Sequence, residues 1–97
     1  GGNILSVDKI KKLDGDINST SGELRYNETL IIGGNIGDDV RLKVKGDLFV
    51  GENIGKAEVE VTGNLYVKNG IRGRNGGKVV VKGNIFAKFI ENANVVS

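Results

Sequence analysis

Short runs of alternating apolar and polar residues recur along the chain at a nearly constant interval. The segments LIIGGNIGDDVRLKVKG (30–46), LFVGENIGKAEVEVTG (48–63) and LYVKNGIRGRNGGKVVVKG (65–83) align with one another, and IFAKFIENANVVS (85–97) is a shorter fourth copy. Each copy reads as strand, turn, strand, with glycine and asparagine in the turn. A period of about 17–20 residues indicates a stack of similar units. The pattern therefore predicts an all-β fold, a single-stranded parallel β-helix (β-solenoid) with about 17–20 residues per coil.

The start of the chain does not fit the repeat. VDKIKKL (7–13) is the one stretch left open to a helix, because no other segment suggests a period of 3.6 residues. We divide the chain into an N-terminal flank, residues 1–14, that could pack on the solenoid, and the solenoid itself, residues 15–97. The first residues are Gly-Gly rather than Met, so we expect a fragment of a longer chain.

Alignment of the copies places equivalent residues in columns, and the apolar columns should point inward. The three predicted core columns are Ile36, Ile54, Ile71 and Ile90; Leu30, Leu48, Leu65 and Ile85; and Val44, Val61 and Val81. Outward positions carry charges whose sign changes from copy to copy, as in Arg41, Glu58 and Lys78, and in Lys43 beside Glu60. A slip of one residue would bury these charges, so the pattern fixes the register.

Glycine and short polar residues recur together where the chain must turn. We expect Gly46, Gly63 and Gly83 to adopt backbone angles that other residues avoid. The residues that follow them, Asp47, Asn64 and Asn84, should bond to the backbone of the turns.

One outward column is apolar where a solvated face would carry polar residues. It consists of Ile31, Phe49, Tyr66 and Phe86, which lie between inward-facing neighbours on the first strand of each copy. Such a ridge is a large exposed apolar patch for a monomer. Either residues 1–14 fold over it, or it binds a protein partner or a second copy of the chain. The last copy also stops at Ser97, and its open edge calls for a cap from the parent protein or from another copy.

The composition argues against catalysis, and we expect no cofactor, small-molecule substrate or metal. The chain has no cysteine and no histidine, so a thiolate nucleophile, the most usual general base and the most usual metal ligand are missing. GIRGRNGGKV (70–79) lacks the first glycine and the Ser/Thr of a phosphate loop. DGDINSTSGE (14–23) lacks the glycine and the bidentate Glu of an EF-hand. No apolar run is long enough to span a membrane.

Charge is unevenly placed along the chain. Residues 1–60 hold eight Lys/Arg against eleven Asp/Glu, whereas residues 61–97 hold six against one. Arg72, Arg74, Lys78 and Lys82, together with Lys68 and Lys88, form a candidate basic patch for an acidic protein or a nucleic acid. Base stacking would need aromatics among these charges, and the aromatics lie on the other strand. The default interpretation is therefore a solvated basic face, without a nucleic-acid partner.

The C-terminal half carries a specific resemblance. GNLYVKNGIRGRNGGKVVVKGNIFAKFIENANVV (63–96), with NGIRG at 69–73 and AKFIENA at 87–93, resembles the flagellar assembly protein A (FapA) family, and so does GDINSTSGEL (15–24). Asn69 departs from the glycine that is more usual in the family. The resemblance implies a right-handed solenoid within a longer bacterial cytoplasmic protein, without established enzymatic activity. It also implies work through protein partners in flagellar assembly or polar positioning.

Three functions from different classes stay open. The first is a rigid scaffold whose ridge docks a protein or a second copy. The second is binding of a polyanion through the basic C-terminal coils, and the third is a filament formed through open ends, as in bactofilins.

Overall fold

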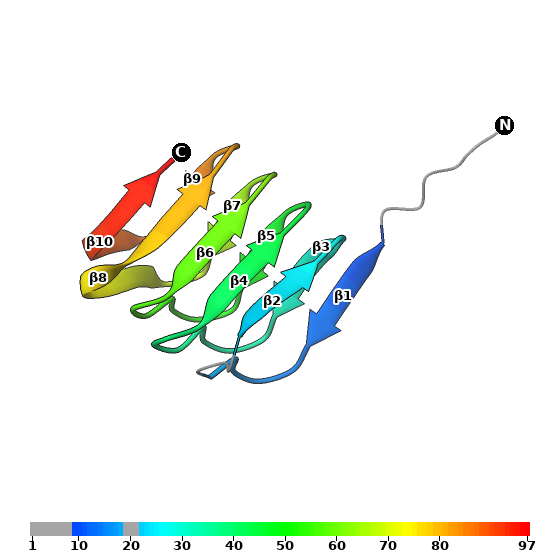
Figure 1. Ribbon diagram of the computed structural model, residues 1–97, viewed down its shortest axis with the longest axis horizontal. Coiled ribbons are helices and arrows are strands. Elements are labelled where there is room, and N and C mark those ends of the chain that lie inside the picture. The colour runs from blue at the N-terminus through cyan, green and yellow to red at the C-terminus, as the bar shows by residue number, and fades with distance from the viewer. Residues whose placement is uncertain (1–8, 19–21) are drawn as a thin grey trace, which may run out of the picture.

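The computed structural model describes residues 9–18 and 22–97, and every regular element in that part of the chain is a β-strand. The strands are short and follow one another through tight turns (Figure 1). In chain order they are β1 (Ile10–Leu13), β2 (Glu23–Tyr26), β3 (Thr29–Ile32), β4 (Arg41–Val44), β5 (Leu48–Val50), β6 (Glu58–Val61), β7 (Leu65–Val67), β8 (Gly70–Val81), β9 (Ile85–Phe86) and β10 (Phe89–Val96).

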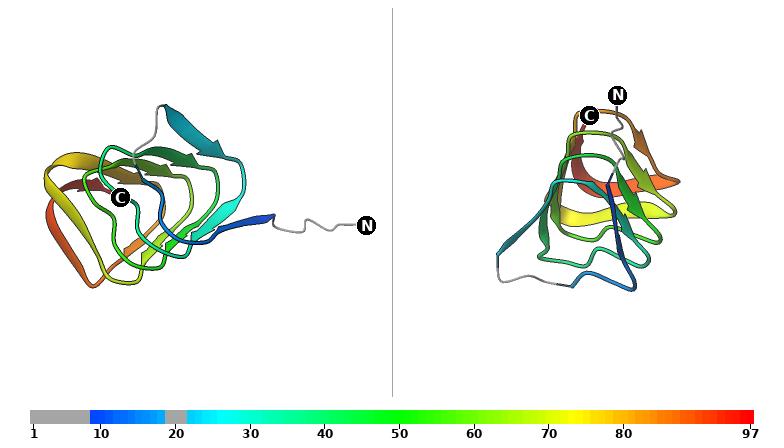
Figure 2. Two further views of the ribbon diagram at one scale, coloured as in Figure 1. Left: turned by 90° about the horizontal axis from the view of Figure 1, so that it is seen from below. Right: turned by 90° about the vertical axis from the view of Figure 1, so that its right-hand side faces the viewer.

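Alternate strands belong to alternate sheets. The first sheet has the order β1-β3-β5-β7-β9 and the second the order β10-β8-β6-β4-β2. All the pairings are parallel, and paired residues are 16 to 20 positions apart in sequence, close to the predicted repeat of about 17–20. Figure 2 shows the coils nested one behind another. The predicted β-solenoid is confirmed.

The core lies between the two sheets and includes most members of the predicted columns. Parallel bridges join Ile17, Ile36, Ile54 and Ile71 in one line, and Leu30, Leu48 and Leu65 are fully buried in another. Ile17 is an additional member that the copies did not include. Ile90 pairs with Ile71 as predicted, but its side chain is 48% exposed rather than inward and buried. β10 ends its sheet, so no described strand covers Ile90.

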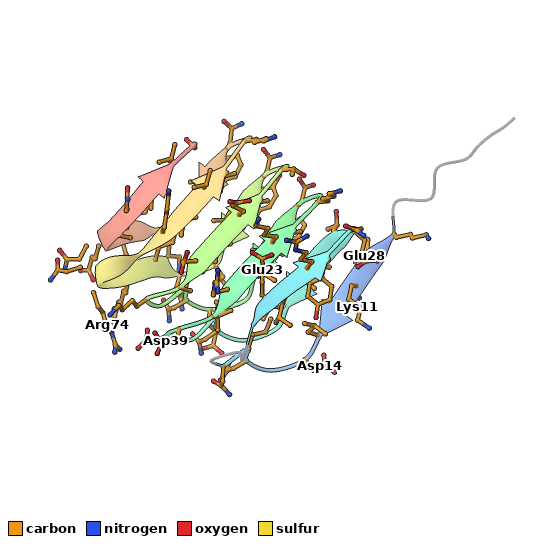
Figure 3. All side chains as sticks on the ribbon, viewed as in Figure 1. Lys11, Asp14, Glu23, Glu28, Asp39 and Arg74 are labelled. Atoms are coloured by element: carbon orange, nitrogen blue, oxygen red, sulfur yellow. The ribbon has the colours of Figure 1, made fainter. Side chains whose placement is uncertain are left out.

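The N-terminal segment joins the stack as a strand, so Ile10–Leu13 of VDKIKKL, the stretch left open to a helix, is extended. β1 pairs with β3, so Lys11 aligns with Leu30 and Lys12 with Ile31. The described part of the predicted flank thus already belongs to the first coil, and residues 7 and 8 of VDKIKKL lie outside the described residues. Lys11 holds a position in the inward-facing column, at the opposite end of the stack from Arg74 (Figure 3).

Side chains in the turns form ladders that run from coil to coil. Asp16 Oδ1 accepts a bond from the Asn35 amide N–H (2.7 Å), Asn35 Oδ1 from that of Asn53 (3.0 Å), and Asn53 Oδ1 from that of Gly70 (3.2 Å). This ladder accounts for the similarity of GGNIG and GENIG. Each asparagine caps the backbone of the next coil, where a backbone acceptor would otherwise be missing.

A second ladder involves the glycine-asparagine steps. Asp47 Oδ1 accepts from the Asn64 N–H (2.8 Å), and Asn64 Oδ1 accepts from the Asn84 N–H (2.9 Å). Of the glycines beside them, only Gly46 has the expected positive φ, 143°. At Gly63 and Gly83 a Cβ would instead collide with an oxygen of the preceding coil. Close packing between coils therefore requires glycine at those two positions, which corrects the backbone-angle prediction.

The glycine-rich segment of residues 70–79 lies within the longest strand, β8. β8 continues through positive φ angles at Arg74, Asn75 and Gly77, and β10 follows it with register shifts on both sides of Ala93. These irregularities accommodate the longer third copy while the flanking columns stay in register.

Candidate functional site

The predicted apolar ridge lies on the outer face of the first sheet. Ile31 aligns with Phe49, Phe49 with Tyr66, and Tyr66 with Phe86, so the four side chains form one column. The Phe49 side chain is 37% exposed and the Phe86 side chain 50% exposed. Leu48 and Val50, which flank Phe49 in the sequence, are buried. The outward direction of the ridge therefore follows from strand alternation.

The three aromatic rings form a continuous stack. The ring centroids of Phe49 and Tyr66 lie 4.5 Å apart and those of Tyr66 and Phe86 5.0 Å apart, and both pairs have an interplanar angle of 6°. These distances are close to the spacing of about 4.8 Å between neighbouring strands, so the coil repeat itself brings the rings into contact. Asn64 Nδ2 donates to the Tyr66 hydroxyl (3.3 Å), which orients the central ring. The ridge is a preorganised surface.

A groove of about 490 Å³ runs beside the ridge. The ridge side chains form one wall, and Gly33, Gly51, Lys68 and Lys88 line the other side. Gly33 and Gly51 have no side chains, so the groove is open at the β3 and β5 coils. At the β7 and β9 coils it is bordered by the two exposed lysines.

The described part of the N-terminal flank does not cover the ridge. β1 lies at the edge of the sheet and places Lys12 next to Ile31 in the same column, so residues 10–13 extend the outer face. Residues 1–8, which also belonged to that prediction, lie outside the described residues.

The four cations predicted as a basic patch lie on β8 or directly after it, and their surroundings differ. Arg72 Nε lies 3.6 Å from Glu91 Oε2, and Arg72 Cζ lies 5.0 Å from the centroid of the Phe89 ring. Arg74 Nη1 donates to Asp38 Oδ2 (3.1 Å). Lys78 aligns with Glu58 on the second sheet. Lys82 lines a groove on that sheet, on the other side of the molecule from the ridge groove. Two of the four charges are thus paired with carboxylates.

A larger groove, about 670 Å³, crosses the second sheet. Its lining combines Arg25, Lys43, Lys45 and Lys82 with Glu60. Lys43 lies within 4 Å of both Glu60 and Glu23 (3.8 and 3.6 Å). Lys43 and Glu60 thus lie side by side on an outer face, as the sequence pattern predicted, although cations outnumber carboxylates in the lining of the groove.

One carboxyl group on this face has a shifted pKa. Arg25 Nε donates to Glu23 Oε1 (2.6 Å) and, with a smaller contribution from Lys43, lowers the pKa of Glu23 below its ordinary value. The Glu23 side chain is partly buried at the edge of the sheet, and a salt bridge explains its shifted pKa without a catalytic role.

In the described ranges no group of three or more His, Cys, Asp or Glu side chains could hold a metal ion. No helix suited to crossing a bilayer occurs over residues 9–18 and 22–97.

Sequence reasoning grouped Lys68 and Lys88 with the basic C-terminal coils, whereas the structure places them beside the aromatic ridge. The signal that could have found this is spacing. Lys68 follows Tyr66 by two positions and Lys88 follows Phe86 by two, and residues two apart on an extended segment share a face.

Comparison with known proteins supplies the family. No curated protein and no solved structure matches the chain. The family model described as the Flagellar Assembly Protein A beta solenoid domain matches residues 9–97, all but the first eight residues. The matched region begins one residue before β1 and therefore includes this first strand of the stack. The chain therefore belongs to the flagellar assembly protein A β-solenoid domain family.

Proposed function

We propose that this domain is a non-enzymatic scaffold that docks a protein through the ridge of Ile31, Phe49, Tyr66 and Phe86. One observation carries the proposal: three aromatic rings stack in register on an outer face, beside a groove. The equivalent outward column on the second sheet contains Arg41, Glu58 and Lys78, as a solvated face should.

Exposure of an aromatic column to water is unfavourable in free energy. Burial of apolar surface stabilises a complex by roughly 25 cal/mol per Å², and rigid aromatic side chains lose little entropy on binding. The ridge side chains are already held in a stack, so a partner need not order them. The groove beside them has apolar walls and lysines rather than a paired acid and base, which supports binding rather than catalysis.

The family gives this scaffold its cellular setting. We place it in a bacterial cytoplasmic protein that acts in flagellar assembly or in polar positioning, and the ridge would hold a component of that machinery. The family match supports the setting, and the stacked ridge supports the mode of action.

The filament alternative is less well supported. Head-to-tail stacking would place the last coil on β1, where Lys11 occupies the column of Leu30 and would face Ile85. Burial of an unpaired ammonium group against an aliphatic side chain is unfavourable. The polyanion alternative loses support from the ion pairs of Arg72 and Arg74.

The test is a pull-down from bacterial extract with three immobilised baits: the wild type, Phe49→Ser/Tyr66→Ser, and Arg41→Ser/Glu58→Ser as a control on the other sheet. We expect specific partners on the wild type and the control, but not on the ridge variant. Raising the salt to about 0.5 M should leave the binding in place, because screening weakens exposed charge interactions much more than apolar contacts. Equal capture by the ridge variant, or complete loss in salt, would contradict the proposal.

A further inference from the structure

The groove beside the ridge has a charge as well as a shape. Lys68 and Lys88 line it, and no acidic residue does. Within the described residues, neither lysine takes part in any of the ion pairs, which involve Arg25, Arg41, Lys43, Arg72 and Arg74. Both side chains are exposed. They are therefore free to bind a carboxylate from outside.

The groove also has a direction. At the β3 and β5 coils it is bordered by Gly33 and Gly51, so an apolar side chain can approach Ile31 and Phe49 there. At the β7 and β9 coils the same positions carry lysine. An occupant that lies along the groove meets an apolar half first and a basic half second.

Strand addition is not available as a binding mode at the β3, β5 and β7 coils of this face. β3, β5 and β7 each have a paired strand on both sides, so their backbone groups are used within the sheet. A partner must bind through side-chain contacts while it crosses the strands, along the axis of the stack. Three strand spacings separate β3 from β9, roughly 14 Å, which about five extended residues cover.

From this arrangement we infer that the ridge groove recognises a short acidic-apolar segment of a partner protein. Its apolar side chain packs on Phe49 beside Gly51, and its Asp or Glu side chains contact Lys68 and Lys88. The apolar anchor and the acids stand within about three residues of each other, because adjacent coils are about 4.8 Å apart. The inference deepens the proposed docking function and rests on it.

Charge also argues against a second copy as the occupant. The same face of another copy would contribute Lys12, Lys68 and Lys88, with Asp14 near its first coil. Mostly like charges would then meet across the contact, which disfavours that pairing.

The experiment is selection of peptides from a displayed random library of about seven residues, a length that spans the groove. Four baits are compared: the wild type, Phe49→Ser/Tyr66→Ser, Lys68→Glu/Lys88→Glu, and a control. Lys45→Glu/Lys82→Glu is the matched control, since it makes the same charge change on the second sheet. We expect the wild type and the control to enrich peptides with an apolar anchor near Asp or Glu. The ridge variant should enrich none of them, and Lys68→Glu/Lys88→Glu should bind them about tenfold more weakly, because attraction becomes repulsion at two exposed sites.

The possible outcomes distinguish failure of this inference from failure of the proposed docking function. Ridge-dependent enrichment of apolar peptides without an acidic preference would overturn the inference and leave the docking function standing. The same holds if Lys68→Glu/Lys88→Glu binds the selected peptides as tightly as the control does. If no peptide depends on Phe49 and Tyr66 and the wild type instead dimerises through the ridge, the acidic segment is the wrong occupant. Enrichment that is unaffected by the ridge variant would overturn both.

Discussion

At some positions of this chain, glycine is required by close contact with the adjacent coil rather than by a left-handed backbone conformation. A Cβ added to Gly51 would collide with the carbonyl oxygen of Gly33 in the preceding coil. At Gly33, the equivalent position one coil earlier, the nearest atom would be 3.4 Å away, an ordinary contact. Neither glycine has a left-handed φ. The need for glycine thus depends on the coil that lies beneath it.

This difference predicts the effects of two alanine substitutions. Gly51→Ala should lower the free energy of unfolding by about 1–3 kcal/mol, because the added methyl group forces two backbones apart. Gly33→Ala is the matched control and should change it by less than about 0.5 kcal/mol. Urea denaturation followed by circular dichroism measures both, and equal effects would contradict the close approach of the two coils.

Glu23 gives a second prediction at this scale. Its pKa is lowered by the hydrogen bond from Arg25 and by Lys43, so the ion pair stabilises the fold above the ordinary carboxyl pKa of 4.5. That contribution is lost as the pH falls from about 4.5 through the lowered pKa. Carbon-detected NMR titration should show the Glu23 pKa moving back toward 4.5 in Arg25→Gln. An unchanged pKa in that variant would contradict the role of Arg25.

At the scale of elements, alternation along the strands was sufficient to predict most of the fold. The pattern of β4 and β6, with charges outside and aliphatic residues inside, fixes which face is buried, because the side-chain period is two. The ridge column followed from the same register. β1 was not predictable in this way, since Ile10–Leu13 has lysine at an inward position and lies at the edge of the stack. The groove lysines were misplaced because nearness in sequence was taken for nearness on one face.

The turn ladders predict a directional effect along the stack. Asn64→Ala should cost about 1 kcal/mol, because it removes the acceptor for the Asn84 N–H and the donor to the Tyr66 hydroxyl. Asn84→Ala retains the bond that its own backbone donates to Asn64, so it should cost clearly less. Thermal unfolding of the two variants tests this difference. A larger loss for Asn84→Ala would show that the ladder does not run in this direction.

The whole molecule is a one-dimensional stack in which each coil contacts mainly its neighbours. Stability should therefore depend on where along the stack a contact is removed. The central coils have a neighbour on both sides, while β1, β2, β9 and β10 lie at the edges of their sheets. The isoleucine column has members both in the central coils and on an edge strand, so the two positions can be compared with one residue type.

Two truncations in that column follow from this. Ile54→Ala should lower the free energy of unfolding by about 2–5 kcal/mol, because Ile54 is fully buried between Ile36 and Ile71. Ile90→Ala should cost less than about 1 kcal/mol, because its side chain is already 48% exposed. Chemical denaturation measures both, and similar losses would contradict the placement of Ile90 at an open end.

The register of the stack underlies the core, the ridge and the groove, and cross-linking tests it directly. The described residues contain no cysteine, and neither does the rest of the sequence, so pairs can be introduced on a clean background. Arg41 and Glu58 are Cα partners on β4 and β6, and neighbouring parallel strands are about 4.8 Å apart, within the range that a disulfide spans. Glu60 faces the same way but is displaced by two residues along the strand, about 8 Å from Arg41. The account predicts that Arg41→Cys/Glu58→Cys oxidises readily to an intramolecular disulfide while Arg41→Cys/Glu60→Cys does not. Preferential cross-linking of the second pair would contradict it.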